Sequence, residues 1–288
     1  MEDWIKAGKI AAEALQYGKE IAKPGIKLLE IAEKVEAKIF ELGGKVAFPV
    51  NLSLNHIAAH YTPSSNDETL FEEEDILKID VGAHVNGAVG DTALTLGNNK
   101  ELIAASEDAL KEAIKLSTPG TELREIGKAI QQAISSYGFA PIRNLSGHEI
   151  EPYKLHAGMT IPNFDNGNTT VLEEGQVIAI EPFATTGTGK IKEGKPSGIY
   201  SFVIDRPVRL PSARRLLSYV QKEYKGLPFS KRALEKKFPQ CSIALVTLER
   251  AGILHHYPQL PEETKGIVSQ AEHTVLVKDK PLVLTRLE

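Results

Sequence analysis

Apolar residues recur at helical spacing in the first part of the chain. They predict one helix through Ile5, Ile10, Ala14 and Leu15, and this pattern loosens at Tyr17-Gly18. A second helix is predicted to open at Pro24-Gly25 and to close at Gly43-Gly44, with an apolar face formed by Leu28, Ile31, Val35 and Ile39. Later apolar runs predict strands at residues 76–79, 177–180, 244–248 and 273–277. The chain therefore combines helices with sheet.

The pattern of the second helix returns later in the chain. Residues 24–44 align with residues 119–139, sharing Pro, Gly, Leu, Glu, Ile, Ile and Gly at the same positions. The alignment continues from His60 to His156 and from residues 72–80 to residues 173–181, which pairs Asp80 with Glu181. Three blocks in the same order argue against chance similarity between two amphipathic helices. We predict two related α+β halves, each with a carboxylate at the end of an apolar strand.

A basic segment interrupts the second half. Between Asp205 and Lys237 ten Lys and Arg residues stand against three Asp and Glu residues. The segment is either a solvated helical subdomain or a basic contact surface for an acidic partner such as ribosomal RNA. After it, the strand-like residues 244–248 are expected to return the chain to the sheet.

The pair Asn86-Gly87 predicts a two-residue type I′ turn between two strands. Pairing outward from this turn sets Gly82 opposite Asp91. Asp80 then shares a sheet face with Asp91 as its diagonal neighbour, at a backbone separation of about 7–8 Å. An isolated pair of Asp residues commonly serves a turn or a helix cap. At this spacing, however, the two carboxylates could also share an ion.

Three further polar residues occur beside apolar strands or glycine. Glu181 follows an apolar run, Glu272 precedes one, and His148 follows Gly147. Taken singly, each could be a hydrogen-bonded core residue. Taken together with Asp80 and Asp91, they place four carboxylates and an imidazole where burial requires compensating positive charge. Two divalent cations would balance four carboxylates, so we predict a dinuclear metal site.

Composition narrows the class of protein. The 288 residues are 42% hydrophobic and 25% charged, with a formal net charge of −4, which fits a globular chain and argues against general nucleic-acid binding. Cys241 is the single cysteine, so an internal disulfide is excluded and a reducing compartment is favoured. The acidic start and the lack of a long apolar run predict neither a secretory signal nor a membrane span. We expect a cytoplasmic protein.

Five segments that run from residue 47 to residue 277 resemble methionine aminopeptidases. They read AFPVNLSLNHIAAHYTP (47–63), IDVGAHVNGAVGDTALT (79–95), NLSGHEIEPYKLHAGMTIPN (144–163), IAIEPF (178–183) and QAEHTVLV (270–277). The resemblance implies the α+β pita-bread fold with an internal pseudo-two-fold repeat, in which residues 1–288 form a single catalytic domain. It also implies removal of N-terminal methionine from nascent proteins by metal-activated water, with a preference for a small second residue.

The resemblance assigns roles to individual residues. The metal ligands it implies for two divalent ions are Asp80, Asp91, His148, Glu181 and Glu272. It also implies that His60 and His156 bind substrate and act in catalysis, and that Glu181 shuttles a proton. Phe48 matches a position in the family's methionine pocket, and Tyr257 is a further candidate for the pocket wall. The oxygen-rich ligand set suits Mn, Fe(II) or Co, and Zn is also compatible.

Chain length and spacing select among the relatives. Only 79 residues precede Asp80, which disfavours the proline-specific dipeptidases because these carry an additional N-terminal domain. The long interval between Glu181 and Glu272 resembles type-2 enzymes of the archaeal form, with a helical subdomain inserted at about residues 187–241. A non-catalytic pita-bread module that binds RNA or ribosomes is the remaining alternative. We expect a monomer that acts on peptide and protein N-termini, associates with no membrane and has a possible ribosome association.

Overall fold

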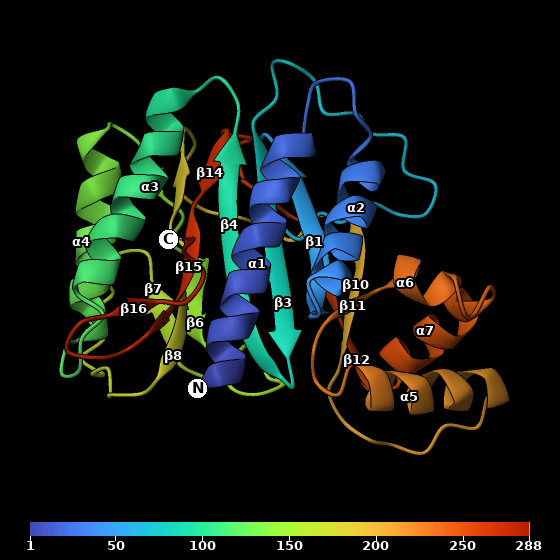
Figure 1. Cartoon of the computed structure of the whole chain (residues 1–288). Coiled ribbons are helices and arrows are strands. Elements are labelled where there is room, and N and C mark those ends of the chain that lie inside the picture. Colours follow the sequence, from blue (N-terminus) through green and yellow to red (C-terminus); the bar gives the residue numbers. More distant parts are fainter. Residues whose placement is uncertain (288) are drawn as a thin grey trace.

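The largest sheet lies at the centre of the molecule, in a computed structural model that describes residues 1–287 (Figure 1). Its strands follow the order β1-β3-β4-β15-β8-β6-β7, β16 pairs with β15, and all of these pairings are antiparallel. The strands are β1 (Lys45–Leu54), β3 (Leu77–Val85), β4 (Ala88–Leu96), β6 (Ser146–Glu149), β7 (Thr160–Pro162), β8 (Val177–Ile180), β15 (Glu272–Leu276) and β16 (Leu282–Val283).

The strand order confirms two related halves. In the first half β1, β3 and β4 lie side by side, in this order from the edge to the centre of the sheet. In the second half β6, β8 and β15 lie side by side, in this order from the other side toward the centre. The strands β3 and β8, which contain or directly precede Asp80 and Glu181, therefore occupy equivalent places. β4 and β15 meet at the centre, so the two halves join there. The predicted α+β class with an internal repeat is confirmed.

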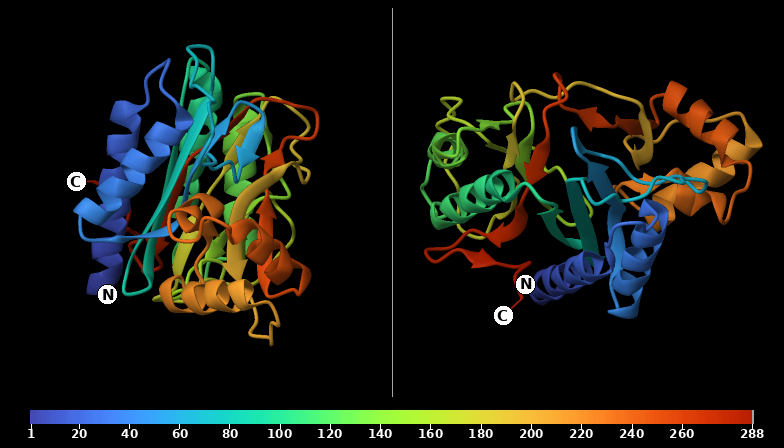
Figure 2. Two further views of the ribbon diagram at one scale, coloured as in Figure 1. Left: turned by 90° about the vertical axis from the view of Figure 1, so that its right-hand side faces the viewer. Right: turned by 90° about the horizontal axis from the view of Figure 1, so that it is seen from above.

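Each half carries a pair of helices on the sheet. These helices are α1 (Glu2–Ile21), α2 (Leu28–Glu41), α3 (Lys100–Lys115) and α4 (Leu123–Ser136). The apolar face predicted for α2 is fully buried in a core cluster shared with α1, β1 and β3, and the corresponding face of α4 is buried in a second cluster with β8 and β15. The left view of Figure 2 shows α1 and α2 on one side of the β3–β4 hairpin. The repeated sequence pattern thus produces two equivalent layers of core.

The first two helices differ slightly from their predicted bounds. α1 continues through Gly18 to Ile21. Glycine fits at position 18 because the helices approach closely there: a Cβ would be 3.1 Å from Val35 Cγ2. α2 begins only at Leu28, since Pro24-Gly25 forms a turn in which Gly25 has a φ of 89°. The predicted hairpin is confirmed. Asn86 and Gly87 have φ values of 51° and 97°, and Gly82 pairs with Asp91.

The basic segment belongs to a unit at one edge of the molecule, coloured orange in Figure 1. A sheet in the order β11-β10-β12 packs with three helices around its own apolar core. These elements are β10 (Pro196–Phe202), α5 (Pro211–Glu223), β11 (Phe229–Ser230), α6 (Lys231–Glu235), α7 (Cys241–Arg250) and β12 (Leu254–Pro258).

The strand predicted at residues 244–248 is wrong, because these residues lie in the helix α7. Ala244, Leu245 and Leu248 are buried at helical spacing together with Cys241, whereas Ile243 and Val246 are exposed. A short apolar run does not distinguish a strand from one face of a helix. The residues around Tyr257 form the strand β12.

Two smaller sheets complete the fold. One pairs β2 (Ile57–Ala59) with β13 (Leu260–Pro261), and the other has the order β14-β9-β5, with β5 (Ala140–Pro141), β9 (Phe183–Thr185) and β14 (Val268–Gln270). Within residues 1–287, none of the helices has both the length and the apolar character needed to cross a bilayer.

Candidate metal centre

One cavity collects all of the predicted site residues. It has a volume of about 240 Å³, and its wall includes Asp80, Asp91, His148, Glu181, Glu272, His60 and His156. Asp80 comes from β3, Asp91 from β4, His148 from β6 and Glu272 from β15, while Glu181 directly follows β8. The β3–β4 hairpin and three segments distant from it in the sequence thus meet at the middle of the central sheet.

The β3–β4 hairpin sets the first two carboxylates on one face. Asp80 pairs with Ala93 and Asp91 with Gly82, so alternation along the strands puts both Asp side chains on the cavity side. Gly82 is required at this place because a Cβ would overlap the ring of Phe48 on β1. Phe48 therefore lies in the cavity wall next to the two carboxylates.

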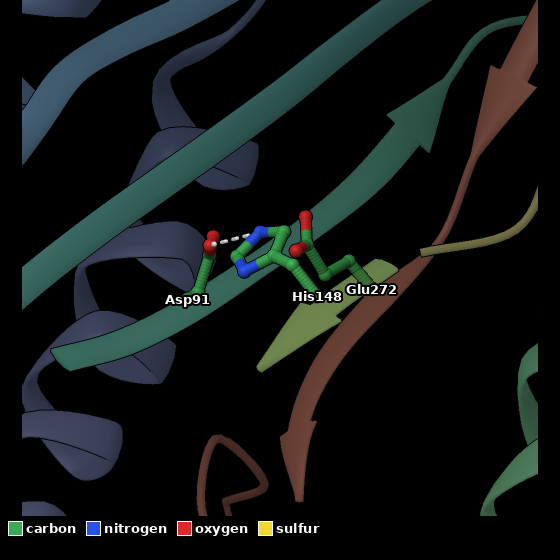
Figure 3. Close-up of side chains that lie close together, drawn as sticks. All are labelled: Asp91, His148 and Glu272. Atoms are coloured by element: carbon green, nitrogen blue, oxygen red, sulfur yellow. Dashed lines mark ion pairs between the residues drawn. The ribbon is translucent and has the colours of Figure 1, made fainter. Parts of the chain in front are cut away.

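The tightest group in the cavity consists of Asp91, His148 and Glu272, which point toward one another in Figure 3. One ligand atom from each lies within 4.8 Å of those from the other two. His148 Nε2 is 3.7 Å from Asp91 Oδ2 and 3.5 Å from Glu181 Oε1, which is too long for strong hydrogen bonds. Asp80 joins this group through an amide, because Gln270 Nε2 donates to Asp80 Oδ2 at 3.3 Å and to Glu272 Oε2 at 3.1 Å.

The carboxylates repel one another in a buried place. Burial raises the pKa of Asp80 to about 7. Burial, and next the neighbouring carboxylates, raise the pKa values of Asp91, Glu181 and Glu272 well above their usual range. Burial lowers the pKa of His148 to about 3, so at neutral pH its contacts with Asp91 and Glu181 are not ion pairs. The described lining of the cavity contains no Lys or Arg to offset this charge.

The site fits a divalent cation. Asp80 Oδ1 and Asp91 Oδ1 are buried and have no hydrogen-bond partner among residues 1–287, which is costly unless another group binds them. Neutral His148 offers an imidazole lone pair beside the carboxylates, and oxygen-rich sites of this kind suit Mn, Fe(II) and Co. A divalent charge would also favour the ionised carboxylates over the protonated ones.

The two predicted substrate histidines lie at the edge of this group. His60 Nδ1 is 3.2 Å from the carbonyl oxygen of Pro258, which can only accept, so Nδ1 carries the proton and Nε2 is a free acceptor. His60 has a φ of 64°, a strained value for a residue other than glycine. His156 lies on the other side, with its ring 4.4 Å from that of His148, and Tyr257 contacts the rings of both substrate histidines.

Sequence reasoning missed several residues of the wall. Gln270 contacts two carboxylates, and its position two residues before Glu272 on the same face is a signal that period-two alternation could have supplied. Asn51, opposite Asp80 on β1, also lines the cavity. Ile199 and Pro228 reach it from the orange unit, and no local pattern marks them. The metal-binding and catalytic roles expected of the predicted site residues stay predictions.

Comparison with known proteins decides the family. The sequence profile of metallopeptidase family M24 matches residues 2–279. This chain belongs to that family.

Curated relatives of this M24 protein match over nearly the whole chain. A methionine aminopeptidase of Thermococcus onnurineus is 51% identical, with 99% of this chain and 98% of the relative covered. One from Pyrococcus horikoshii is 50% identical, covering 98% of this chain and 97% of the relative.

Solved structures agree on the fold of this M24 protein. A methionine aminopeptidase from Thermotoga maritima superposes with a TM-score of 0.71 at 24% identity and covers 99% of this chain and 96% of its own. A prolidase from Pyrococcus furiosus gives 0.63 at 21% identity and covers all of this chain and 64% of its own. A thermophilic Arx1 gives 0.88 at 18% identity, covering 98% and 90%. These likenesses confirm the predicted pita-bread fold.

Proposed function

We propose that this M24 metallopeptidase hydrolyses the peptide bond after an N-terminal methionine, and that it prefers a small second residue. The observation that carries the proposal is the single cavity in which four carboxylates and His148 lie beside apolar side chains such as Phe48 and Ile199. Relatives that are about half identical over the whole chain are named methionine aminopeptidases. The cavity can therefore hold the apolar side chain of a substrate methionine next to the carboxylates and His148.

The proposed ligand set is Asp80, Asp91, His148, Glu181 and Glu272, holding two divalent ions. Two ions are proposed because their charge balances four carboxylates, and Mn, Fe(II), Co or Zn are the candidates. The chemistry supplied by such ions when bound is activation of water and polarisation of the peptide carbonyl.

The remaining steps fall to side chains of this chain. Glu181 is partly exposed to the cavity and would carry a proton to the leaving amine. His156 is exposed at the cavity and would donate a hydrogen bond to the developing oxyanion. His60 presents Nε2 as an acceptor, which suits the N–H of the scissile amide.

The subtype and the domain organisation are also proposals. The interval between Glu181 and Glu272 contains the compact unit with its own core, as expected of a type-2 insertion. We assign residues 1–288 to one catalytic domain and residues 187–241 to an inserted subdomain. Since α7 and β12 belong to the same core, the unit would reach somewhat further than this on its C-terminal side.

The proposed activity also suggests the partners, the location and the oligomeric state of the protein. The partners proposed are the N-termini of peptides and proteins. Association of the basic segment with the ribosome is tested by cosedimentation. We propose a cytoplasmic monomer. Sedimentation of the purified protein measures the oligomeric state.

A peptide assay tests the function. Met-Ala-Ser, Met-Pro and Ala-Pro peptides are each incubated with protein that has been stripped with chelator and then supplied with Mn²⁺ or Co²⁺. The proposal expects release of methionine from Met-Ala-Ser only, and none from an Asp91→Asn variant. Preferential cleavage of Ala-Pro would indicate a proline dipeptidase, and cleavage of none of the peptides would indicate a non-catalytic module.

A further inference from the structure

The two halves of the central sheet are joined by very little backbone pairing. Between β4 and β15 only Glu272 with Ala93 and His273 with Thr92 pair directly. Yet Asp91 lies on one side of this junction and Glu272 on the other. The separation of these two carboxylates therefore depends on whatever holds β4 against β15.

Beyond the two directly paired residues, threonine side chains hydrogen-bond the main chain of the facing strand. Thr274 faces Asp91, and its hydroxyl accepts from Asp91 N at 2.7 Å and donates to Asp91 O at 2.8 Å. At the other end Thr95 faces Gln270 and does the same, accepting from Gln270 N at 2.8 Å and donating to Gln270 O at 2.7 Å. Both threonines are buried. The two threonines flank the directly paired residues in one continuous register.

A hydroxyl suits this place because it can donate and accept at once. Each threonine satisfies both the N–H and the C=O of the residue that faces it. The contacts act on residues of the site itself: Thr274 holds the main chain of Asp91, and Thr95 holds Gln270, whose amide contacts Asp80 and Glu272. Thr92 adds a third link from the helix side, donating to Glu272 O at 2.8 Å.

We infer that the hydroxyls of Thr274 and Thr95 are positioning groups that fix the separation of the carboxylates across the β4–β15 junction. This inference rests on the proposed metal site. The two threonines would touch neither metal nor substrate. They would act by holding Asp91 and Gln270 in place, which makes cation affinity sensitive to side chains that are not ligands.

Thr274→Val tests the inference, because valine keeps the shape of threonine and removes the hydroxyl. Thr274→Ser restores the hydroxyl. Ser117→Ala is the matched control: it deletes a buried hydroxyl that donates to a backbone carbonyl, that of Ala113 at the end of α3, away from the junction. Mn²⁺ affinity and stoichiometry are measured by calorimetry on chelator-stripped, folded protein. The coupling between bound Mn²⁺ ions, which depends on their separation, is measured by electron paramagnetic resonance.

The expected result is an Mn²⁺ affinity at least tenfold weaker in Thr274→Val, with an altered spin coupling, and near-normal values in Thr274→Ser and Ser117→Ala. Thr95→Val should shift the same two quantities in the same direction. If Thr274→Val only lowers the melting temperature while binding and coupling stay normal, the threonines are merely structural and the inference is overturned. If the unaltered protein itself binds no Mn²⁺, the proposed metal site fails instead, so the two failures are distinct.

Discussion

Arg232 Nη2 donates to Glu36 Oε1 at 2.6 Å, joining α6 of the inserted unit to α2 of the catalytic half. Both side chains are largely buried, with exposures of 3% and 19%. In the described part of the chain, Arg232 Nε and Nη1 have no hydrogen-bond partner. Burial outweighs the attraction of Arg232 and raises the pKa of Glu36. The cost of burying these two charges is therefore only partly offset by their mutual attraction and hydrogen bond.

Breaking this pair should cost far more stability than replacing it. Glu36→Gln leaves a buried, uncompensated guanidinium and is expected to lower the free energy of unfolding by about 3–5 kcal/mol. The double variant Glu36→Leu, Arg232→Met, which removes both charges, should be close to neutral or more stable. Urea unfolding of the single and double variants measures both. A double variant as unstable as Glu36→Gln would show that the pair contributes net stability.

The metal-free protein should become less stable as pH rises. Asp80 has a pKa of about 7 in the fold against its ordinary value of 3.8, so the folded state binds the proton more tightly. Stability is therefore retained below about pH 4 and lost as the pH rises toward 7, by about 4 kcal/mol for this group alone. Asp80→Asn should remove this loss. Chelator-treated Asp80→Asn is expected to match the unaltered protein at pH 4 and to exceed its melting temperature at pH 8.

Addition of Mn²⁺ should reverse that difference. Cation binding stabilises the folded state by linkage, so the unaltered protein should gain melting temperature and activity while Asp80→Asn gains little. In the metal-free comparison, a melting temperature of Asp80→Asn equal to that of the unaltered protein at pH 8 would contradict the repulsion between ionised carboxylates in the cavity.

His156→Ala should separate catalysis from metal binding. Because its proposed role is a hydrogen bond to the oxyanion, the variant should lose about 10²–10³ in kcat and keep both ions and the native fold. Asp91→Ala should lose metal together with activity. Metal content by mass spectrometry on both purified variants checks this expectation. A metal-free His156→Ala protein would place His156 among the ligands.

Glu262 should stabilise the fold in a pH-dependent way. Although burial opposes it, hydrogen bonds from Gly266, Thr264 and Thr188 lower the pKa of Glu262 to about 2. The resulting stability is present above the unfolded pKa near 4.5 and is lost as the pH falls toward 2, about 3 kcal/mol in all.

Glu262→Gln is therefore expected to be less stable than the unaltered protein at pH 7, and the difference should shrink below pH 4. Glu263→Gln is the control, since this neighbour is exposed. Urea unfolding between pH 2 and 7 measures both variants. A difference that stayed constant across this range would mean that the carboxylate charge is not what the hydrogen bonds stabilise.

Local sequence patterns predicted much of the fold. The repeat of residues 24–44 at 119–139 predicted the equivalent helices α2 and α4, and Asn86-Gly87 predicted the register that sets Gly82 opposite Asp91. They failed at residues 244–248, where an apolar run of five residues is compatible with either a strand or one face of a helix. Burial against α5 decides in favour of the helix there.

The sequence by itself determined which polar residues interrupt or flank the apolar strands, because two-residue alternation and turn chemistry act over a few neighbouring positions. Asp80, predicted to end its strand, lies inside β3 because the pairing with β1 and β4 continues past it. Only the tertiary structure decided what lies around these polar residues. Gln270 between Asp80 and Glu272, the threonine hydroxyls across the β4–β15 junction, and Ile199 in the cavity wall all depend on the pairing of distant segments. Such contacts leave no periodic trace along the chain, since each is fixed by how the two halves and the inserted unit pack.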